Sequence, residues 1–322
     1  MAGLALNQGV FTVSIDFELI WGTLDLFGPD RFRRACEVER KVVVDRLLEL
    51  LAEFEIPATW CIVGHLFLDR CEGGHREMVR PHHSWVEDDW FARDPGTDIE
   101  RDPIFYGRDL VGKIMACPVP QEIGSHSFSH VIFGDPGCSR ETAQSELAAC
   151  VRLAEERGFK LQSFVFPRNM VGHLDVLRDY GFACYRGPEP GWYESRNWPK
   201  PVKRLAHLWD VIAASQPPVS LPEYSESGLW NIPASMIYFP MDGIRRYIPM
   251  ERRVKRAVKG LEAAARQQRI FHLWFHPTNL AQETEVMFKG LRAICMRARE
   301  LKNEGKLEFL PMGAIVAAIQ SQ

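Results

Sequence analysis

Short runs of apolar and β-branched residues alternate along the chain with longer stretches in which apolar residues recur at helical spacing. The short runs predict buried strands, because four to eight such residues in a row fit a strand that is covered on both faces. The longer stretches predict helices with one buried face. The predicted strands are 9–16, 58–64, 121–126, 161–167, 182–187, 270–276 and the start of 306–319. The predicted helices are 33–56, 108–117, 140–157, 173–181, 250–268, 283–304 and the end of 306–319.

This alternation predicts an α/β fold with a parallel sheet. With about seven strands in 322 residues, a closed or nearly closed β/α barrel competes with an open doubly wound sheet. Two segments interrupt the rhythm, about 70–106 and 188–250, and both are rich in Gly, Pro and aromatic residues. We interpret them as loop elaborations of a single domain that covers 1–322, because no repeat or composition shift marks a boundary.

Composition and charge argue against a nucleic-acid-binding, membrane-spanning or secreted protein. The chain is 46% hydrophobic and 25% charged, with a net charge of −3, which gives no electrostatic case for binding nucleic acid. The sequence contains no run of about 18 apolar residues, so no transmembrane helix is predicted. The first residues lack the basic and apolar regions of a secretion signal, and the eight scattered cysteines form no disulfide framework. We therefore expect a cytoplasmic protein. The sequence does not indicate its oligomeric state.

Polar residues gather where the predicted strands end. Asp16 and Glu18 close the first strand and point to one side of it, with Phe17 on the other. His126 ends the third strand, and His130 follows four residues later, a spacing that places both on one face of a helical turn. Because the carboxyl ends of parallel strands meet at one edge, we expect these side chains to converge.

Two imidazoles and one carboxylate form a three-ligand site for zinc or a similar divalent ion, with a fourth position open for water. A second carboxylate can accept a proton from that water, and a histidine can protonate a leaving amine. His276, at the end of a late strand, can provide that histidine. These groups together fit metal-assisted amide hydrolysis.

The chain resembles the polysaccharide deacetylases, which are metal-dependent carbohydrate esterases with an irregular β/α barrel and NodB homology. The resemblance lies in segments that occur in the family's order over most of the chain. They are "TVSIDFE", "ATWCIVGHLF", "EIGSHSFSH", "FVFPRN" and "LWFH".

The resemblance implies a role for each matched residue. His126 and His130 would bind the metal, Asp16 would be the catalytic base, Arg168 would orient that base, and His276 would be the general acid. In the commonest form of the first motif, an aspartate follows the base directly and binds the metal.

This sequence has Phe17 at that position, and Phe17 cannot be a ligand. Glu18 then takes the ligand role, as in members with two carboxylates on one strand face. The alternative is that Asp16 binds the metal and the base lies elsewhere. Zinc is the expected metal, with cobalt, nickel or manganese as alternatives.

Four tryptophans outside the predicted core elements are candidates for stacking on a sugar ring. They are Trp21, Trp85, Trp90 and Trp192.

The expected function is a metal-dependent N-deacetylase. It would hydrolyse the N-acetyl or other N-acyl group of an amino sugar, in an intracellular precursor for surface polysaccharide. One alternative is hydrolysis of a small non-sugar C–N bond, as in an amide or ureide. The other is a non-catalytic carbohydrate-binding barrel, a hypothesis based on Phe17.

Overall fold

The computed structural model describes residues 6–190, 198–199, 202–203 and 209–321. Its described strands form one sheet. They are β1 (Gly9–Phe17), β2 (Thr59–Ile62), β3 (Glu122–Ser125), β4 (Ser163–Val165), β5 (Cys184–Arg186), β6 (Glu223–Tyr224), β7 (Trp230–Asn231), β8 (Met236–Ile237), β9 (Ile270–Phe275) and β10 (Leu307–Phe309).

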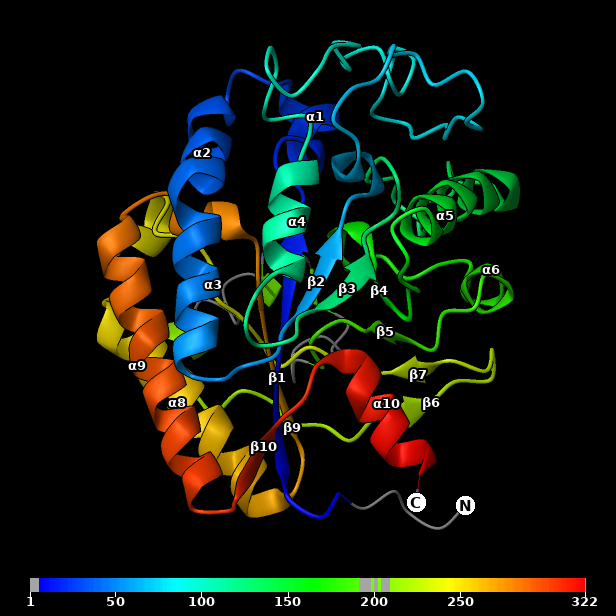
Figure 1. Ribbon diagram of the computed structural model, residues 1–322. Helices are drawn as coiled ribbons and strands as arrows, with labels where there is room; N and C mark the ends of the chain where they lie inside the picture. The colour runs from blue at the N-terminus through cyan, green and yellow to red at the C-terminus, as the bar shows by residue number, and fades with distance from the viewer. Residues whose placement is uncertain (1–5, 191–197, 200–201, 204–208, 322) are drawn as a thin grey trace.

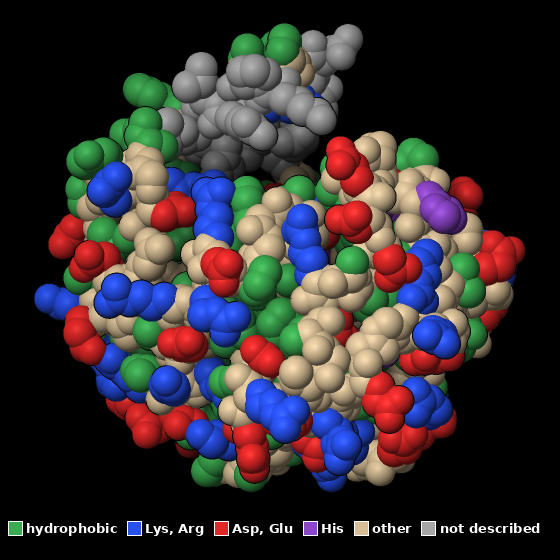
Figure 2. All heavy atoms as spheres, turned by 90° about the horizontal axis from the view of Figure 1, so that it is seen from above, with side chains coloured by type: hydrophobic (Ala, Val, Ile, Leu, Met, Phe, Trp, Pro, Cys, Tyr) green, Lys and Arg blue, Asp and Glu red, His purple; other side chains and the backbone are tan. Residues whose placement is uncertain are grey.

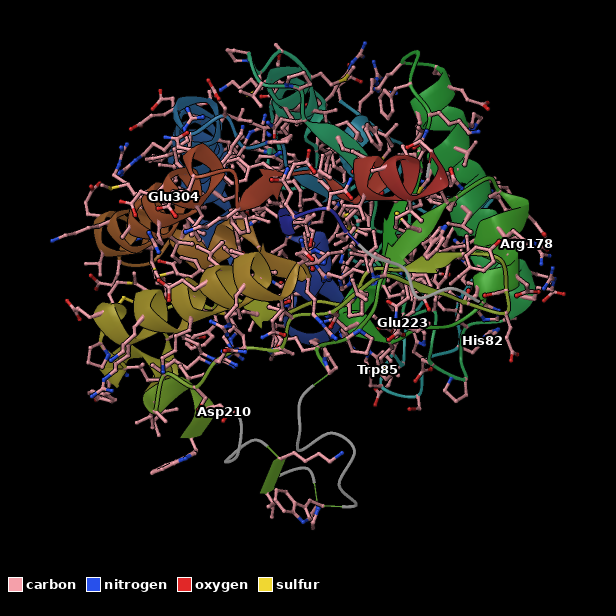
Figure 3. All side chains as sticks on the ribbon, turned by 90° about the horizontal axis from the view of Figure 1, so that it is seen from below. His82, Trp85, Arg178, Asp210, Glu223 and Glu304 are labelled. Atoms are coloured by element: carbon pink, nitrogen blue, oxygen red, sulfur yellow. The ribbon has the colours of Figure 1, made fainter. Side chains whose placement is uncertain are left out.

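Helices surround this sheet and form an outer layer (Figures 1 and 3). They are α1 (Trp21–Phe27), α2 (Arg33–Val38), α3 (Val44–Glu53), α4 (Arg108–Met115), α5 (Arg140–Glu155), α6 (Leu174–Asp179), α8 (Met250–Gln267), α9 (Thr284–Asn303) and α10 (Met312–Gln320). A π-helical turn, Glu39–Val43, joins α2 to α3. Short 3-10 turns cover Gly64–Phe67, Pro167–Asn169, Gly243–Tyr247 and Pro277–Leu280.

The strand order is β6-β7-β5-β4-β3-β2-β1-β9-β8, and β10 also pairs with β1. All pairings are parallel except that of β6 with β7. All nine residues of β1 are buried, and β1 contacts three neighbouring strands. The predicted β/α barrel is confirmed, with more strands than expected because β6, β7 and β8 lie inside the segment interpreted as a loop.

The segment that contains β7 and β8 nearly closes the barrel. On one side, Ile232 N donates to Tyr185 O and Ala234 N donates to Gly187 O, at 2.9 and 3.0 Å. On the other side, Ser235 N donates to the carbonyl of His272 in β9, at 2.9 Å. A single stretch, 230–238, therefore connects the β5 edge of the sheet to the β9 edge.

The other irregular segment, 70–106, has no helix or strand among its residues and covers one end of the barrel (Figure 1). That end is where β1, β2 and β3 finish. The face seen from above carries acidic and basic side chains intermixed, without an extended patch of one sign (Figure 2). No helix in the described part of the chain is both long and apolar enough to span a membrane.

Candidate functional site

Strand β1 positions two buried carboxylates at the end of the barrel. Asp16 is 2% exposed and Glu18 8%, and alternation along the strand directs both to the same side. Phe17 points the other way and packs edge-on against Trp60, with ring centroids 5.9 Å apart. A carboxylate at position 17 would therefore point into the hydrophobic core and away from the site.

Gly22, in the first turn of α1, makes room for the Glu18 carboxylate. A Cβ atom at this position would lie 1.7 Å from Glu18 Oε2. Any larger residue would force Glu18 to move, because such a contact is far inside van der Waals distance.

The segment between β3 and α5 positions His126 and His130. It is not the helical turn that the spacing predicts, because Ser127 and His130 have left-handed φ values of 61° and 64°. The two rings still lie side by side, with centroids 5.1 Å apart. His126 Nδ1 lies 2.7 Å from the carbonyl of Val165 and donates to it, which leaves Nε2 free to face the site.

Glu146 of α5 holds this segment in place, and no motif in the sequence pointed to it. Its carboxylate accepts from Phe128 N, Ser129 N and Ser129 Oγ, each at 2.8 Å. Burial raises the pKa of Glu146 to about 7 despite these hydrogen bonds. The loop between the two histidines is thus fixed by a buried residue 16 positions after His130.

The Glu18 carboxylate and the two imidazoles meet at one point. Glu18 Oε1 lies 2.9 Å from His126 Nε2 and 3.2 Å from His130 Nε2. Ligand atoms around a tetrahedral zinc ion are about 3.3 Å apart, given bond lengths of about 2.0 Å. His130 Nδ1 is buried and has no hydrogen-bond partner among the described residues. The donor set and its spacing fit a divalent ion.

Asp16 is held by an arginine that the sequence did not indicate. Arg186, in β5, donates to both carboxylate oxygens of Asp16 at 2.7 Å. Arg186 also donates to Ser14 Oγ and to Asn169 Oδ1, at 2.9 and 3.0 Å. Burial alone would raise the pKa of Asp16, but the charges of Arg186 and His126 outweigh burial and the pKa is lowered.

The prediction that Arg168 orients Asp16 is therefore wrong in this structure. Arg168 instead forms an ion pair with Asp25 and lies over the Trp85 ring, 5.1 Å from its centroid. Its backbone has a left-handed φ of 54°, and the residue lines the same cavity as Asp16.

His276, just after β9, faces both carboxylates. Its Nε2 lies 3.4 Å from Glu18 Oε1 and 3.8 Å from Asp16 Oδ2. Burial would lower the pKa of His276, but the charges of Glu18 and Asp16 raise it to about 9. The same contacts explain Glu18: burial opposes ionisation, yet His276 and His130 hold its pKa well below the usual range.

Two further buried groups lie behind the site. His272 Nε2 contacts Ser14 Oγ at 2.8 Å, and burial together with Arg186 lowers the pKa of His272 to about 3. It is neutral and supports the Arg186 network. Glu39, in the π-helical turn, has neither carboxylate oxygen hydrogen-bonded within the described chain. Burial and the Glu18 charge raise the pKa of Glu39 well above its usual value.

A cavity of about 360 Å³ opens onto these groups. Its volume is in the range of pockets for small ligands. Asp242 and Arg245 lie at its exposed side, and Trp274 forms part of its wall. Residues from the site that line it are Asp16, Glu18, His130, Asn169 and His276.

The four candidate tryptophans have different surroundings. Trp21 is 2% exposed, donates to Phe105 O and packs on His65, so most of its ring is covered. It lines the same cavity as Trp85 and Trp90, and its contact with a sugar stays a prediction. Trp85 and Trp90 line a separate cavity of about 150 Å³ beside Ser129 (Trp85 is labelled in Figure 3). Trp192 lies outside the described residues.

Comparison with known proteins supports the fold. No family model and no curated protein matches the sequence. Among solved structures, a protein from Mycobacterium smegmatis assigned as a polysaccharide deacetylase matches with a TM-score of 0.65 and 13% identity, over 100% of this chain and 95% of its own. One from Pseudomonas aeruginosa PAO1 with the same assignment matches with a TM-score of 0.58 and 12% identity, over 96% and 89%.

The PuuE allantoinase matches with a TM-score of 0.61 and 11% identity, over 97% of this chain and 90% of its own. At these identities the likeness shows the fold alone. Proteins with this barrel therefore include members named for different substrates.

Proposed function

We propose that this protein is a metal-dependent hydrolase that removes the N-acetyl or another N-acyl group from an amino sugar. One observation carries the proposal: the carboxylate of Glu18 and the imidazoles of His126 and His130 share one point, with Asp16 and His276 beside it. Metal-assisted amide hydrolysis uses this combination of metal ligands, a base and an acid.

Glu18, His126 and His130 would hold the metal, with zinc expected first and cobalt, nickel or manganese as alternatives. When bound, such an ion lowers the pKa of water and polarises a carbonyl group. Three protein ligands leave a coordination position open for water or substrate.

The chain's own residues would perform the proton transfers. Asp16 accepts a proton from the attacking water, and the two hydrogen bonds from Arg186 keep its carboxylate oriented and ionised. His276, whose pKa the charges of Glu18 and Asp16 raise to about 9 against the effect of burial, donates a proton to the departing amine nitrogen. Both groups line the cavity, so both have access to a bound substrate.

The proposed substrate is an intracellular, amino-sugar-containing precursor of surface polysaccharide. The names of two structural neighbours, both given as polysaccharide deacetylases, support an acetylated carbohydrate. All eight cysteines are free, which supports a reducing, cytoplasmic environment. Trp274 in the cavity wall, and Trp85 and Trp90 beside Ser129, are the proposed contacts for sugar rings.

A second candidate function is hydrolysis of a small ureide or other non-sugar C–N bond. The likeness to the PuuE allantoinase favours it, and a cavity of about 360 Å³ also accommodates a small heterocycle. The same metal, base and acid would act in both reactions.

A substrate panel with metal-loaded protein separates these functions. N-acetylated mono- and oligosaccharides are compared with cyclic ureides and formamides, and released acetate, amine or ring-opened product is measured. Asp16→Asn is expected to retain metal and lose activity by at least a hundredfold, because it removes only the base. Glu18→Ala is expected to lose metal and activity together. Glu308→Gln, at the exposed middle position of β10, is the matched control.

The hydrolase proposal fails if full-occupancy metal supports no turnover on any member of the panel. It also fails if Asp16→Asn retains full activity. Protein that binds no metal after loading with zinc, cobalt or nickel, yet still binds sugars, would instead be a carbohydrate-binding barrel.

A further inference from the structure

A second cluster of potential metal ligands lies in the segment 64–94, outside the site described above. It consists of His65, Cys71, His75 and Asp94, whose nearest ligand atoms all lie within 4.8 Å of one another. The sequence spaces these residues irregularly, and only the fold brings them together. The cluster contains the one thiol placed next to two imidazoles in the described chain.

His65 presents an unpartnered nitrogen to the cluster. Its ring is fully buried, and Nδ1 lies 3.0 Å from the carbonyl of Phe105, to which it donates. That hydrogen bond places the lone pair on Nε2, which has no hydrogen-bond partner among the described residues. Histidines that bind metals are oriented by this kind of bond from the opposite nitrogen.

Asp94 forms the centre of the cluster. Its side chain is fully buried, and its Oδ2 lies 2.8 Å from His75 Nε2 and 3.4 Å from His65 Nε2. The backbone N–H of Gly96 donates to Oδ1 at 3.1 Å and fixes the carboxylate. Burial of a charged carboxylate is costly without a cation or strong partners.

Cys71 supplies the fourth atom. Its Sγ lies 3.4 Å from Asp94 Oδ2 and 3.2 Å from Tyr106 Oη. Cys71 and His75 also line a surface cavity of about 790 Å³, which gives an ion a route in from solvent.

We propose that His65, Cys71, His75 and Asp94 bind a structural zinc ion. One sulfur, two imidazole nitrogens and one carboxylate oxygen form a closed four-ligand set of the kind that zinc accepts. Bonds of about 2.0–2.1 Å to nitrogen and oxygen and about 2.3 Å to sulfur place neighbouring ligand atoms roughly 3.3–3.6 Å apart. The observed separations of 2.8–3.4 Å from Asp94 Oδ2 need only small side-chain adjustments.

The ion would fix the long segment that covers the proposed active site. Cys71 and His75 lie near the start of segment 70–106 and Asp94 lies after Trp85 and Trp90 in the same segment. Since this segment has no helix or strand, a cross-link between its parts would reduce the freedom it loses on folding.

The same ion would also brace the loop between His126 and His130. His65 N donates to Phe128 O and Gly64 N donates to Ser127 O, at 2.9 and 2.8 Å. Immobilising His65 therefore immobilises the backbone between the two proposed catalytic ligands. This inference does not depend on the proposed function, because the second cluster contains none of the residues proposed to act in hydrolysis.

Metal stoichiometry tests the inference first. Protein is stripped with a chelator, reloaded with zinc and desalted, and zinc per chain is measured by mass spectrometry. We expect two zinc ions per chain in the wild type. Cys71→Ser should lose the ion of the second cluster and keep one, and Glu18→Ala should lose the ion of the proposed active site and keep one. Cys117→Ser is the matched control, since Cys117 is also partly exposed but has no ligand cluster near it in the described chain.

Cobalt provides a signature that belongs to this site alone. A cobalt–thiolate charge-transfer band in the near ultraviolet is expected in the wild type, Cys117→Ser and Glu18→Ala. The band should be absent in Cys71→Ser and reduced at least tenfold in His75→Gln, a variant that keeps the thiol. Circular dichroism of each variant establishes that it is folded.

Absence of the band in folded, cobalt-saturated wild type would overturn the inference. So would a single zinc ion per chain that is lost in Glu18→Ala and retained in Cys71→Ser. In either case the cluster is a hydrogen-bonded network around Asp94 and binds no metal.

Discussion

The guanidinium of Arg186 is the single group that contributes most to the position of Asp16. It is fully buried, pairs with Asp16 and lies 4.2 Å from the centre of the Trp274 ring. Removing one partner of such a pair leaves a charge buried without compensation. Arg186 is therefore both a structural and a positioning residue for the proposed base.

We expect Arg186→Ala to lower the free energy of unfolding by about 3–5 kcal/mol. It should also reduce kcat far more than KM, because Asp16 loses its orientation. Arg168→Ala should cost much less, since its side chain is 27% exposed and Asp25 keeps the hydrogen bond from Trp85. Urea denaturation and steady-state kinetics measure both. Equal losses in the two variants would contradict this assignment.

His272 is expected to make the free energy of unfolding decrease as the pH falls. Its pKa of about 3 in the folded state lies below the unfolded value of about 6.5, so the unfolded chain binds the proton more readily. The stabilisation is fully present above about pH 6.5 and is lost as the pH falls toward about 3, at up to about 1.4 kcal/mol per pH unit.

His272→Gln removes this titration and keeps a donor or acceptor near Ser14. Plotted against pH from 7 to 4, the free energy of unfolding should fall less steeply in the variant than in the wild type. Denaturant unfolding at each pH measures the two slopes. Parallel slopes would show that another group governs acid sensitivity.

Among the elements, those with clear periodicity were predictable from sequence. The predicted helix 33–56 appears as α2, a π-helical turn and α3, and the strand that ends at Asp16 extends one residue further as β1. Strands of two residues carry no periodicity, which is why β7 and β8 were missed. They exist because their backbone groups pair with β5 and β9.

The site residues were only partly predictable from the sequence. The convergence of Asp16, Glu18 and the histidines follows from where strands end, a rule that holds for all parallel sheets. Arg186 is the last residue of β5, so the same rule places it at this edge of the sheet, but no motif around it marks a role. No local pattern could show that its side chain reaches Asp16, which is 170 residues earlier in the chain.

Helix α5 gives an element-scale prediction through Glu146. In Glu146→Ala, three buried donors of the β3–α5 loop lose their acceptor, so we expect a loss of at least about 2 kcal/mol in stability. Zinc binding at His126 and His130 should weaken at least tenfold, because the loop loosens. Competition titration with a chromogenic chelator measures the affinity.

Glu146→Gln should retain most of both properties, since its side-chain oxygen still accepts from the two backbone N–H groups. Glu141→Ala, on the exposed first turn of the same helix, is the control for helix effects. If Glu146→Ala binds zinc as tightly as Glu141→Ala, the loop is held by other contacts.

Residues 230–238 close the barrel by connecting the β5 edge of the sheet to the β9 edge. Ser235 Oγ accepts from His272 N at 3.0 Å, in addition to the backbone bond from Ser235 N. Ser235→Ala leaves the buried N–H of His272 without that acceptor, so we expect about 1–3 kcal/mol of lost stability. Hydrogen exchange should accelerate at His272 and Tyr238 together.

Ser321→Ala, which removes one exposed hydrogen bond at the end of α10, should leave exchange in β9 unchanged. Faster exchange at His272 alone would mean that the closing segment is not a cooperative part of the barrel.

The place of β1 has a consequence for how the protein is made. β1 precedes the other described strands, and its partners β9 and β10 are synthesised roughly 260–300 residues after it. Until then β1, whose nine residues are all buried in the complete fold, lacks two of its three partner strands, which is a hazard for aggregation during translation. The proposed catalytic carboxylates and His276 are therefore assembled in one of the last steps of folding, so a nascent chain halted before β9 would lack the proposed acid and two of the three strands that pair with β1.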